Sequence, residues 1–214
     1  MKSKNKKKKI IIIIVILLVI AIVGGVFFYR YMKNKNTNIE TKTVEVLDTI
    51  KDYDYHLEDR DTELYKETFL QLKDLLEKTE TIDYQKYAEY VAILFLVDLY
   101  TIDNKINKYD VGSLDFIYSE EKEKFQNKVM DSMYKMVIDN SSNTRSQELP
   151  IVKKVNITKT ENTKYQKGEN TLEGYLIKAT IDYEKNLGYD EEATLTIVRE
   201  ENKLYVVNIT TSES

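Results

Sequence analysis

The sequence predicts an α+β fold, in which an N-terminal transmembrane helix is followed by three helices packed on a four-stranded antiparallel meander. Three observations support this prediction. Nineteen apolar residues run without interruption from Ile10 to Phe28. Before the single proline, Pro150, apolar residues recur at helical spacing, and after it they alternate with a period of two. Helices first and strands second are typical of an α+β domain.

The apolar run has the length of a membrane-spanning helix. At a rise of about 1.5 Å per residue it covers roughly 28 Å, which is close to the thickness of the bilayer hydrocarbon. Six lysines precede the run and three basic residues follow it by position 35, so we expect the N-terminus in the cytoplasm and the rest of the chain outside. This predicts a single-pass protein of the cell membrane. The alternative is a cleaved signal peptide, with Val23 and Gly25 at the small-residue positions of the cleavage site.

The basic tail, residues 1–9, is predicted to contact anionic lipid headgroups. A basic residue close to such headgroups gains about 1 kcal/mol. The contacting residues would be Lys6, Lys7, Lys8 and Lys9. After the span, residues 10–28, we expect a juxtamembrane linker at 29–42 and an extracytoplasmic domain at 43–214, whose helical half ends at 149.

The charge of the domain narrows the range of partners. Residues 1–35 hold nine of the 32 basic residues and none of the 36 acidic ones, which leaves 23 against 36, or −13, for the remainder. A surface this acidic repels nucleic acid, so we expect no nucleic-acid partner. The absence of cysteine excludes disulfides, thiol nucleophiles and thiolate metal sites.

Three helices are predicted in the first half of the domain. The first covers about Thr62 to Lys78, with Asp61 as its N-cap. The second, Tyr84 to Tyr100, is apolar nearly all round and should be buried, with Asp83 as its N-cap. The third covers about Ser119 to Ile138. Its buried face is expected to hold five apolar residues: Phe125, Val129, Met133, Met136 and Val137.

Four strands are predicted in the second half. The clearest is Tyr175 to Tyr183, where apolar residues occupy every second position. The others are Lys154 to Thr160, Ala193 to Arg199 and Leu204 to Thr210, and a tight turn separates the last two. Helices laid on such a meander would cover one face and leave a concave mouth.

This order of elements resembles the NTF2-like ectodomains of bitopic envelope proteins. The resemblance covers residues 61 to 210 and rests on the order of the helices and strands, not on particular residues. Such domains occur in scaffold subunits of bacterial conjugation and type IV secretion machines. The resemblance therefore implies a cystatin-like cone of helices on a sheet, and a role in binding other proteins.

One polar cluster could bind a metal. In a strand, Asp52, Asp54, His56 and Glu58 would project from one face, and three carboxylates with a histidine could hold a divalent ion. In the competing interpretation, Tyr53, Tyr55 and Leu57 form the buried face of an edge strand and the acids face water. A helix over the same residues also fits the apolar spacing and would scatter the ligands. We expect no metal or other cofactor.

Further patterns carry less information. The stretch Asp103 to Leu114 superficially resembles a calcium loop, but Lys105, Lys108 and Leu114 stand where the pattern needs an oxygen ligand, a glycine and a glutamate. A surface loop, with a strand-like stretch after it from Leu114 to Tyr118, is expected instead. Five of the 17 tyrosines fall on predicted core stripes. They are Tyr65, Tyr84, Tyr87, Tyr175 and Tyr183.

Together these patterns favour a protein that works by binding. The chain has one histidine, no cysteine, and no glycine-rich phosphate loop among six glycines, so we expect no enzyme. The prediction is a membrane-anchored extracytoplasmic scaffold of the bacterial cell envelope, with protein partners or self-association. Two alternatives stay open: a sensor that binds a ligand in an aromatic-lined pocket, and a wall-active hydrolase with paired carboxylates.

Overall fold

A computed structural model describes residues 43–78 and 80–211 of the chain. The described residues belong to the second of the two units into which the chain divides, Lys42–Ser214. The predicted membrane span, residues 10–28, lies outside the described residues. Within the described ranges, no helix is both long and apolar enough to cross a membrane.

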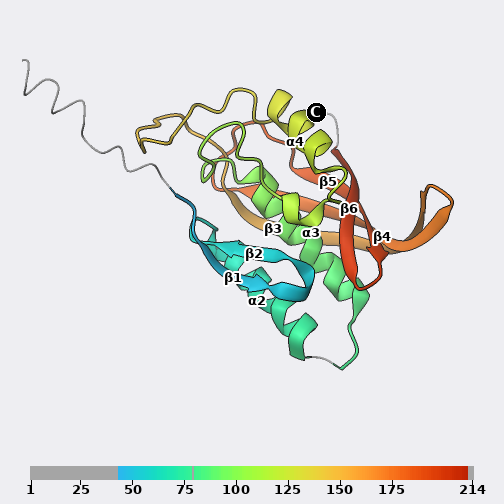
Figure 1. The fold of residues 1–214 in the computed structure, drawn as a ribbon. Helices are drawn as coiled ribbons and strands as arrows, with labels where there is room; N and C mark the ends of the chain where they lie inside the picture. The colour runs from blue at the N-terminus through green and yellow to red at the C-terminus, as the bar shows by residue number, and fades with distance from the viewer. Residues whose placement is uncertain (1–42, 79, 212–214) are drawn as a thin grey trace, which may run out of the picture. The chain divides into compact units, whose positions relative to one another are not determined.

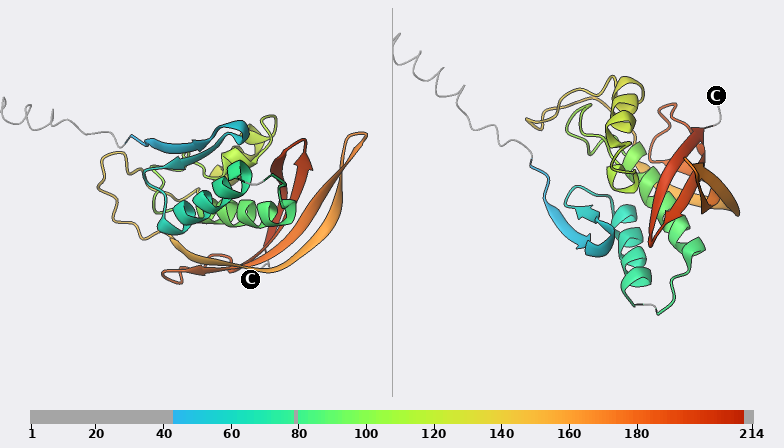
Figure 2. Two further views of the ribbon diagram at one scale, coloured as in Figure 1. Left: turned by 90° about the horizontal axis from the view of Figure 1, so that it is seen from below. Right: turned by 45° about the vertical axis from the view of Figure 1, so that its right-hand side comes forward.

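The fold is α+β, but it contains two antiparallel sheets where one was predicted. Two strands form a small sheet in the order β1-β2, and four form a large sheet in the order β3-β4-β5-β6. Two helices, α2 and α3, lie between the two sheets (Figure 2, left). The predicted fold class, three helices on a single meander behind a transmembrane helix, is therefore wrong for the described residues.

The small sheet is the part that the prediction missed. Strand β1 (Val46–Ile50) pairs with β2 (Tyr55–Glu58) across a short 3₁₀ turn, Lys51–Tyr53. Asp54 closes this turn with a positive φ of 54°. A positive φ lies outside the range of extended backbone, so the strand cannot continue through this residue. Aspartate is one of the few residues other than glycine that tolerate the conformation. Residues 43–58 are thus a hairpin, neither one strand nor a helix.

The two helices behind this hairpin follow the sequence pattern. Helix α2 is Glu63–Lys78, and the Thr62 hydroxyl, not the predicted Asp61, accepts a hydrogen bond from the Tyr65 amide at 3.3 Å. Helix α3 is Tyr84–Tyr100, with the predicted cap, because Asp83 accepts from the Lys86 amide at 3.0 Å. Ten α3 residues are buried, as expected for a helix without a polar face.

The segment after α3 departs from the prediction at two places. Residues 114–118 do not form a strand but begin with a 3₁₀ turn, Leu114–Phe116. Helix α4 is Lys122–Asp131 and ends seven residues before the predicted Ile138. It ends because the chain turns to bury Tyr134, whose hydroxyl donates to the Leu99 carbonyl at 2.7 Å. Beyond this turn Met136 is 77% exposed, contrary to the prediction that it is buried.

The large sheet is the predicted meander, with every strand longer than predicted and β3 and β4 extended the most. Its members are β3 (Val152–Lys167), β4 (Asn170–Tyr183), β5 (Glu192–Glu200) and β6 (Lys203–Thr211). β4 pairs with β5 only from Gly174 onward, so the tip of the β3–β4 hairpin projects as a two-stranded arm (Figure 1). Within the described residues β6 pairs only with β5, which leaves its other edge without a strand.

Tyrosines hold the layers together. The hydroxyls of Tyr55 on β2 and Tyr87 on α3 lie 2.7 Å apart, and the Tyr55 hydroxyl also donates to the Leu204 carbonyl on β6 at 3.0 Å. Of the five tyrosines predicted on core stripes, Tyr65 and Tyr87 are fully buried. The remaining three are partly buried and pack against the core. The hydroxyls thus join three separate elements at the centre of the domain.

Candidate functional site

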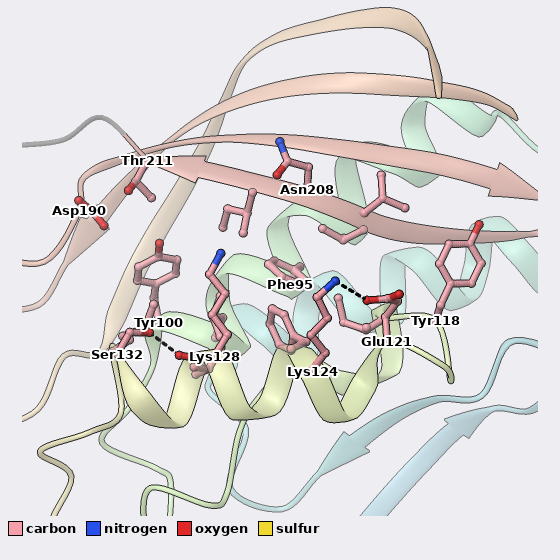
Figure 3. Close-up of a pocket in the computed structure, with 18 of the residues that line it drawn as sticks. Phe95, Tyr100, Tyr118, Glu121, Lys124, Lys128, Ser132, Asp190, Asn208 and Thr211 are labelled. Atoms are coloured by element: carbon pink, nitrogen blue, oxygen red, sulfur yellow. Dashed lines mark hydrogen bonds and ion pairs between the residues drawn. The ribbon is translucent and has the colours of Figure 1, made fainter. Parts of the chain in front are cut away.

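A cleft in the described domain lies between α4 and β6. It encloses about 740 Å³. Figure 3 shows α4 along one side and the large sheet along the other, with Phe95 and Tyr100 of α3 at the back. The C-terminal half of β6 contributes consecutive residues to the wall, from Val206 to Ile209.

The interior of the cleft is apolar and aromatic. Phe95 of α3 and Phe125 of α4 pack with ring centroids 5.9 Å apart. Tyr100 is buried, and burial together with the nearby Asp190 raises the pKa of its hydroxyl, which stays neutral. The other apolar and aromatic residues of this interior are Leu99, Ile117, Val129, Met133, Tyr165, Tyr189, Val206, Val207 and Ile209. Such walls favour an apolar or aromatic group, because contact between two apolar surfaces removes both of them from water.

One end of the cleft is closed by a charged aromatic cluster. The Tyr118 and Tyr205 rings stack with centroids 4.0 Å apart, and the Lys167 ammonium lies 3.5 Å from the Tyr118 centroid. Lys167 also pairs with Glu200 at 2.9 Å and Glu120 at 3.3 Å. Desolvation lowers its pKa but the hydrogen bonds to the two glutamates raise it more, so the net shift is upward. The cation is thus fixed over the ring.

The Tyr118 hydroxyl stands apart within this cluster. The side chain is only 7% exposed, and among the described residues its oxygen has no hydrogen-bond partner. Burial raises the pKa of this hydroxyl, and the Glu200 carboxylate that faces it at more than ordinary hydrogen-bond distance raises the pKa further, so the hydroxyl keeps its proton. A buried hydroxyl without a partner is costly, and a bound polar group would satisfy it.

The outer rim of the cleft carries lysines of α4. Lys124 pairs with Glu121 at 3.3 Å, in a contact where the lysine is 84% exposed. Lys128, one turn later, is exposed and forms no ion pair with any described residue. In Figure 3 its ammonium points from the helix toward the sheet. With respect to the described part of the chain, the rim therefore offers one unpaired cation, Lys128, and one weakly held cation, Lys124.

A second, smaller cavity of about 260 Å³ lies beside the small sheet. Arg60 bridges Glu58 and Asp110, while the ammonium of Lys105 pairs with Asp98. Desolvation raises the pKa of Asp110, whereas the hydrogen bond and the charge of Arg60 lower it. The net shift of this pKa is downward. These charges hold one another in place, so we interpret the cavity as a structural ion-pair cluster.

The predicted polar cluster is divided by the hairpin turn. Asp52 and Asp54 lie in the turn, whereas His56 and Glu58 lie on β2 and line the smaller cavity. His56 contacts Asp115 at 2.9 Å and Asp54 at 3.5 Å. Among the residues that the structure describes, no group of three or more potential ligands could hold a metal ion.

The other predicted contact residues, Lys6, Lys7, Lys8 and Lys9, lie outside the described residues. The sequence did place Phe125, Val129 and Met133 on the inner face of a helix, and all three line the α4–β6 cleft. It did not single out Lys128 or Tyr118, because neither belongs to a motif. Their importance depends on which strand lies opposite α4, and that is a tertiary property.

Comparison with known proteins gives no family for this chain. No family model, no curated protein and no solved structure matches it. The resemblance to NTF2-like ectodomains therefore stays a prediction, and the geometry of the cleft is the basis for any functional proposal.

Proposed function

We propose that this chain is a membrane-anchored binding protein of the cell envelope, whose described domain holds a partner in the α4–β6 cleft. The observation that carries the proposal is the cleft itself. Its volume of about 740 Å³ falls within the range of ligand sites, and its walls are apolar with a few polar groups at the rim. The membrane location rests on the apolar run, residues 10–28, and on the lysines before it.

The charges in the cleft favour binding over hydrolysis. A glycosidase needs one carboxyl group with a raised pKa to act as general acid. At Glu120 the pKa is lowered, first by a hydrogen bond from its own main chain and further by Lys167, although desolvation opposes the shift. Glu121 is paired with Lys124. Glu120 and Glu121, two of the three carboxylates that line the cleft, thus serve to hold lysines in position.

Site-specific photocrosslinking in cells tests this proposal. A benzoylphenylalanine at Met133 lies inside the cleft, and the same group at Glu67, exposed on α2, lies outside it. We expect irradiation of the full-length protein to give a discrete adduct from position 133 and none from position 67. Equal labelling at both positions, or none at either, would contradict a binding role for the cleft.

A further inference from the structure

We infer that the partner is an extended polypeptide segment that adds to the free edge of β6 as a further strand and carries alternating apolar and acidic side chains. The inference rests on the proposed function and names the class of partner. It follows from three properties of the cleft: an unpaired strand edge, a helix opposite that edge, and a division of the walls into an apolar interior and a basic rim.

The first property is the edge of β6. Among the described strands, β6 (Lys203–Thr211) is paired on one side only, with β5. The cleft follows the other side, because Val206, Val207, Asn208 and Ile209 line it in succession. An edge strand presents main-chain donors and acceptors at regular spacing, and an extended peptide satisfies them by pairing.

The second property is the position of α4. The helix lies along the far side of the cleft, across from the sheet (Figure 3). A second copy of this domain that continued the sheet here would have to place its own neighbouring strands beside α4 as well. A single extended segment has no neighbouring strand and fits between the helix and the edge. The position of α4 thus favours a single strand over a sheet-to-sheet dimer.

The third property fixes the side chains of the segment. Successive side chains of a strand point to opposite faces. Those that face inward would meet Phe95, Phe125 and Val129, and should be apolar. Those that face outward would pass the lysines of the rim, Lys124 and Lys128, and should be acidic.

The Tyr118 hydroxyl supplies an additional contact. It is buried, has no hydrogen-bond partner among the described residues, and lines the same cleft. A carbonyl oxygen of an added strand would accept a hydrogen bond from it. This contact lies at the end of the cleft near the β6 residue Tyr205, where pairing with the edge would begin.

The test uses purified full-length protein and a fluorescein-labelled peptide of seven residues in which glutamate and valine alternate. We expect saturable binding, and slower hydrogen exchange of the amides in residues 203–211 when the peptide is bound. N-methylation of alternate peptide amides should weaken binding by about tenfold or more, because it removes the main-chain donors. Replacement of glutamate by lysine in the peptide should weaken it similarly.

A pair of variants isolates the rim. Lys128→Glu should weaken binding of the peptide by about tenfold, whereas Lys135→Glu, the same charge change at an exposed residue outside the cleft, should leave it unchanged. Equal melting temperatures show that both variants fold.

Two results would overturn the inference. One is binding that is insensitive to N-methylation. The other is that octanoate, an amphiphile without main-chain amides, binds in the cleft through Lys128, while the bound peptide leaves the hydrogen exchange of the β6 amides unchanged. In either case a photocrosslink from Met133 would leave the proposed function standing and reject only the strand partner.

Discussion

At the scale of single residues, the ion pair between Lys105 and Asp98 is the most constrained charge contact of the described domain. Lys105 is 1% exposed, and its ammonium donates a hydrogen bond to one carboxylate oxygen of Asp98. The other oxygen of this carboxylate accepts a hydrogen bond from the main-chain amide of Ser113. Loss of one member of a buried pair leaves the other charge without compensation and costs roughly 3–5 kcal/mol. The loop that carries Lys105 is therefore fixed to α3 by electrostatics.

Asp61 lies close to this pair and should make stability depend on pH. Desolvation is the main cause that raises the pKa of its carboxyl to about 7, and Asp98 and Glu58 add to it. The Glu58 amide and Lys105 act in the opposite direction. The folded state thus binds the proton more tightly than the unfolded chain, whose aspartates titrate near 3.9. The contribution of Asp61 is complete below about pH 4 and is lost as the pH rises through about 7.

Replacement of Asp61 by asparagine should remove this dependence. In the parent, the Glu58 main-chain amide donates a hydrogen bond to the Asp61 carboxylate at 2.7 Å. The side-chain oxygen of asparagine can accept the same hydrogen bond, but asparagine carries no charge whose burial is costly. We expect the variant to match the parent near pH 4 and to be more stable above about pH 7, by up to about 4 kcal/mol at 1.36 kcal/mol per pKa unit. Urea unfolding at several pH values measures the difference. Asp52→Asn, at an exposed site in the β1–β2 hairpin, controls for the loss of one charge. A difference in stability between Asp61→Asn and the parent that does not change with pH would refute the assignment.

At the scale of elements, Gly174 marks the point where the β3–β4 arm leaves the large sheet. It is buried and pairs with Val198 of β5. A Cβ atom at this position would lie 2.4 Å from the Ile197 carbonyl oxygen, which belongs to the main chain and cannot swing aside. We expect Gly174→Ala to destabilise the domain by about 1–3 kcal/mol, the usual cost of overpacking.

Thermal unfolding of the purified variant measures this cost. Lys178→Ala, at an exposed position on the same strand, is the matched control and should stay within about 0.5 kcal/mol of the parent. If both variants have the same stability, the close approach of β4 and β5 at Gly174 is not a constraint on the fold.

The elements also show where sequence patterns succeed. Helix α3 and the strands β4 to β6 were predicted because a long apolar helix and strict alternation each have one explanation. Residues 43–58 fit a strand and a helix equally well, and only the αL conformation of Asp54 makes them a hairpin. The end of α4 depends on a contact between Tyr134 and Leu99, which are 35 residues apart. Local spacing cannot contain that information.

The candidate site was predictable to a similar degree. Helical spacing identified the inner face of α4, including Phe125 and Val129, and the predicted meander included β6. What the sequence could not predict is their juxtaposition, in which, among the described residues, Lys128 at the rim has no ion-pair partner and the Tyr118 hydroxyl has no hydrogen-bond partner. Both features exist only once α4 and the edge of β6 lie side by side.

At the scale of the whole molecule, the second unit, Lys42–Ser214, contains its own core. Buried residues from the small sheet, the helices and the large sheet form one hydrophobic cluster, which includes Ile50, Phe95 and Leu195. Domains of this size can bury enough surface to be stable alone. The sequence from Lys42 onward should therefore need nothing from the residues before it in order to fold.

We thus expect a chain that begins at Lys42 to unfold in a single cooperative transition, with an enthalpy of about 0.7 kcal/mol per residue near 60 °C. Differential scanning calorimetry measures this, and the calorimetric and van't Hoff enthalpies should agree. A chain that begins at Tyr55 is the control. It lacks β1 and with it Ile50, which is 1% exposed, so it should lose the cooperative transition or melt far lower. A chain from Lys42 that behaves like the one from Tyr55 would show that the second unit does not fold by itself, because its core would then depend on residues outside it.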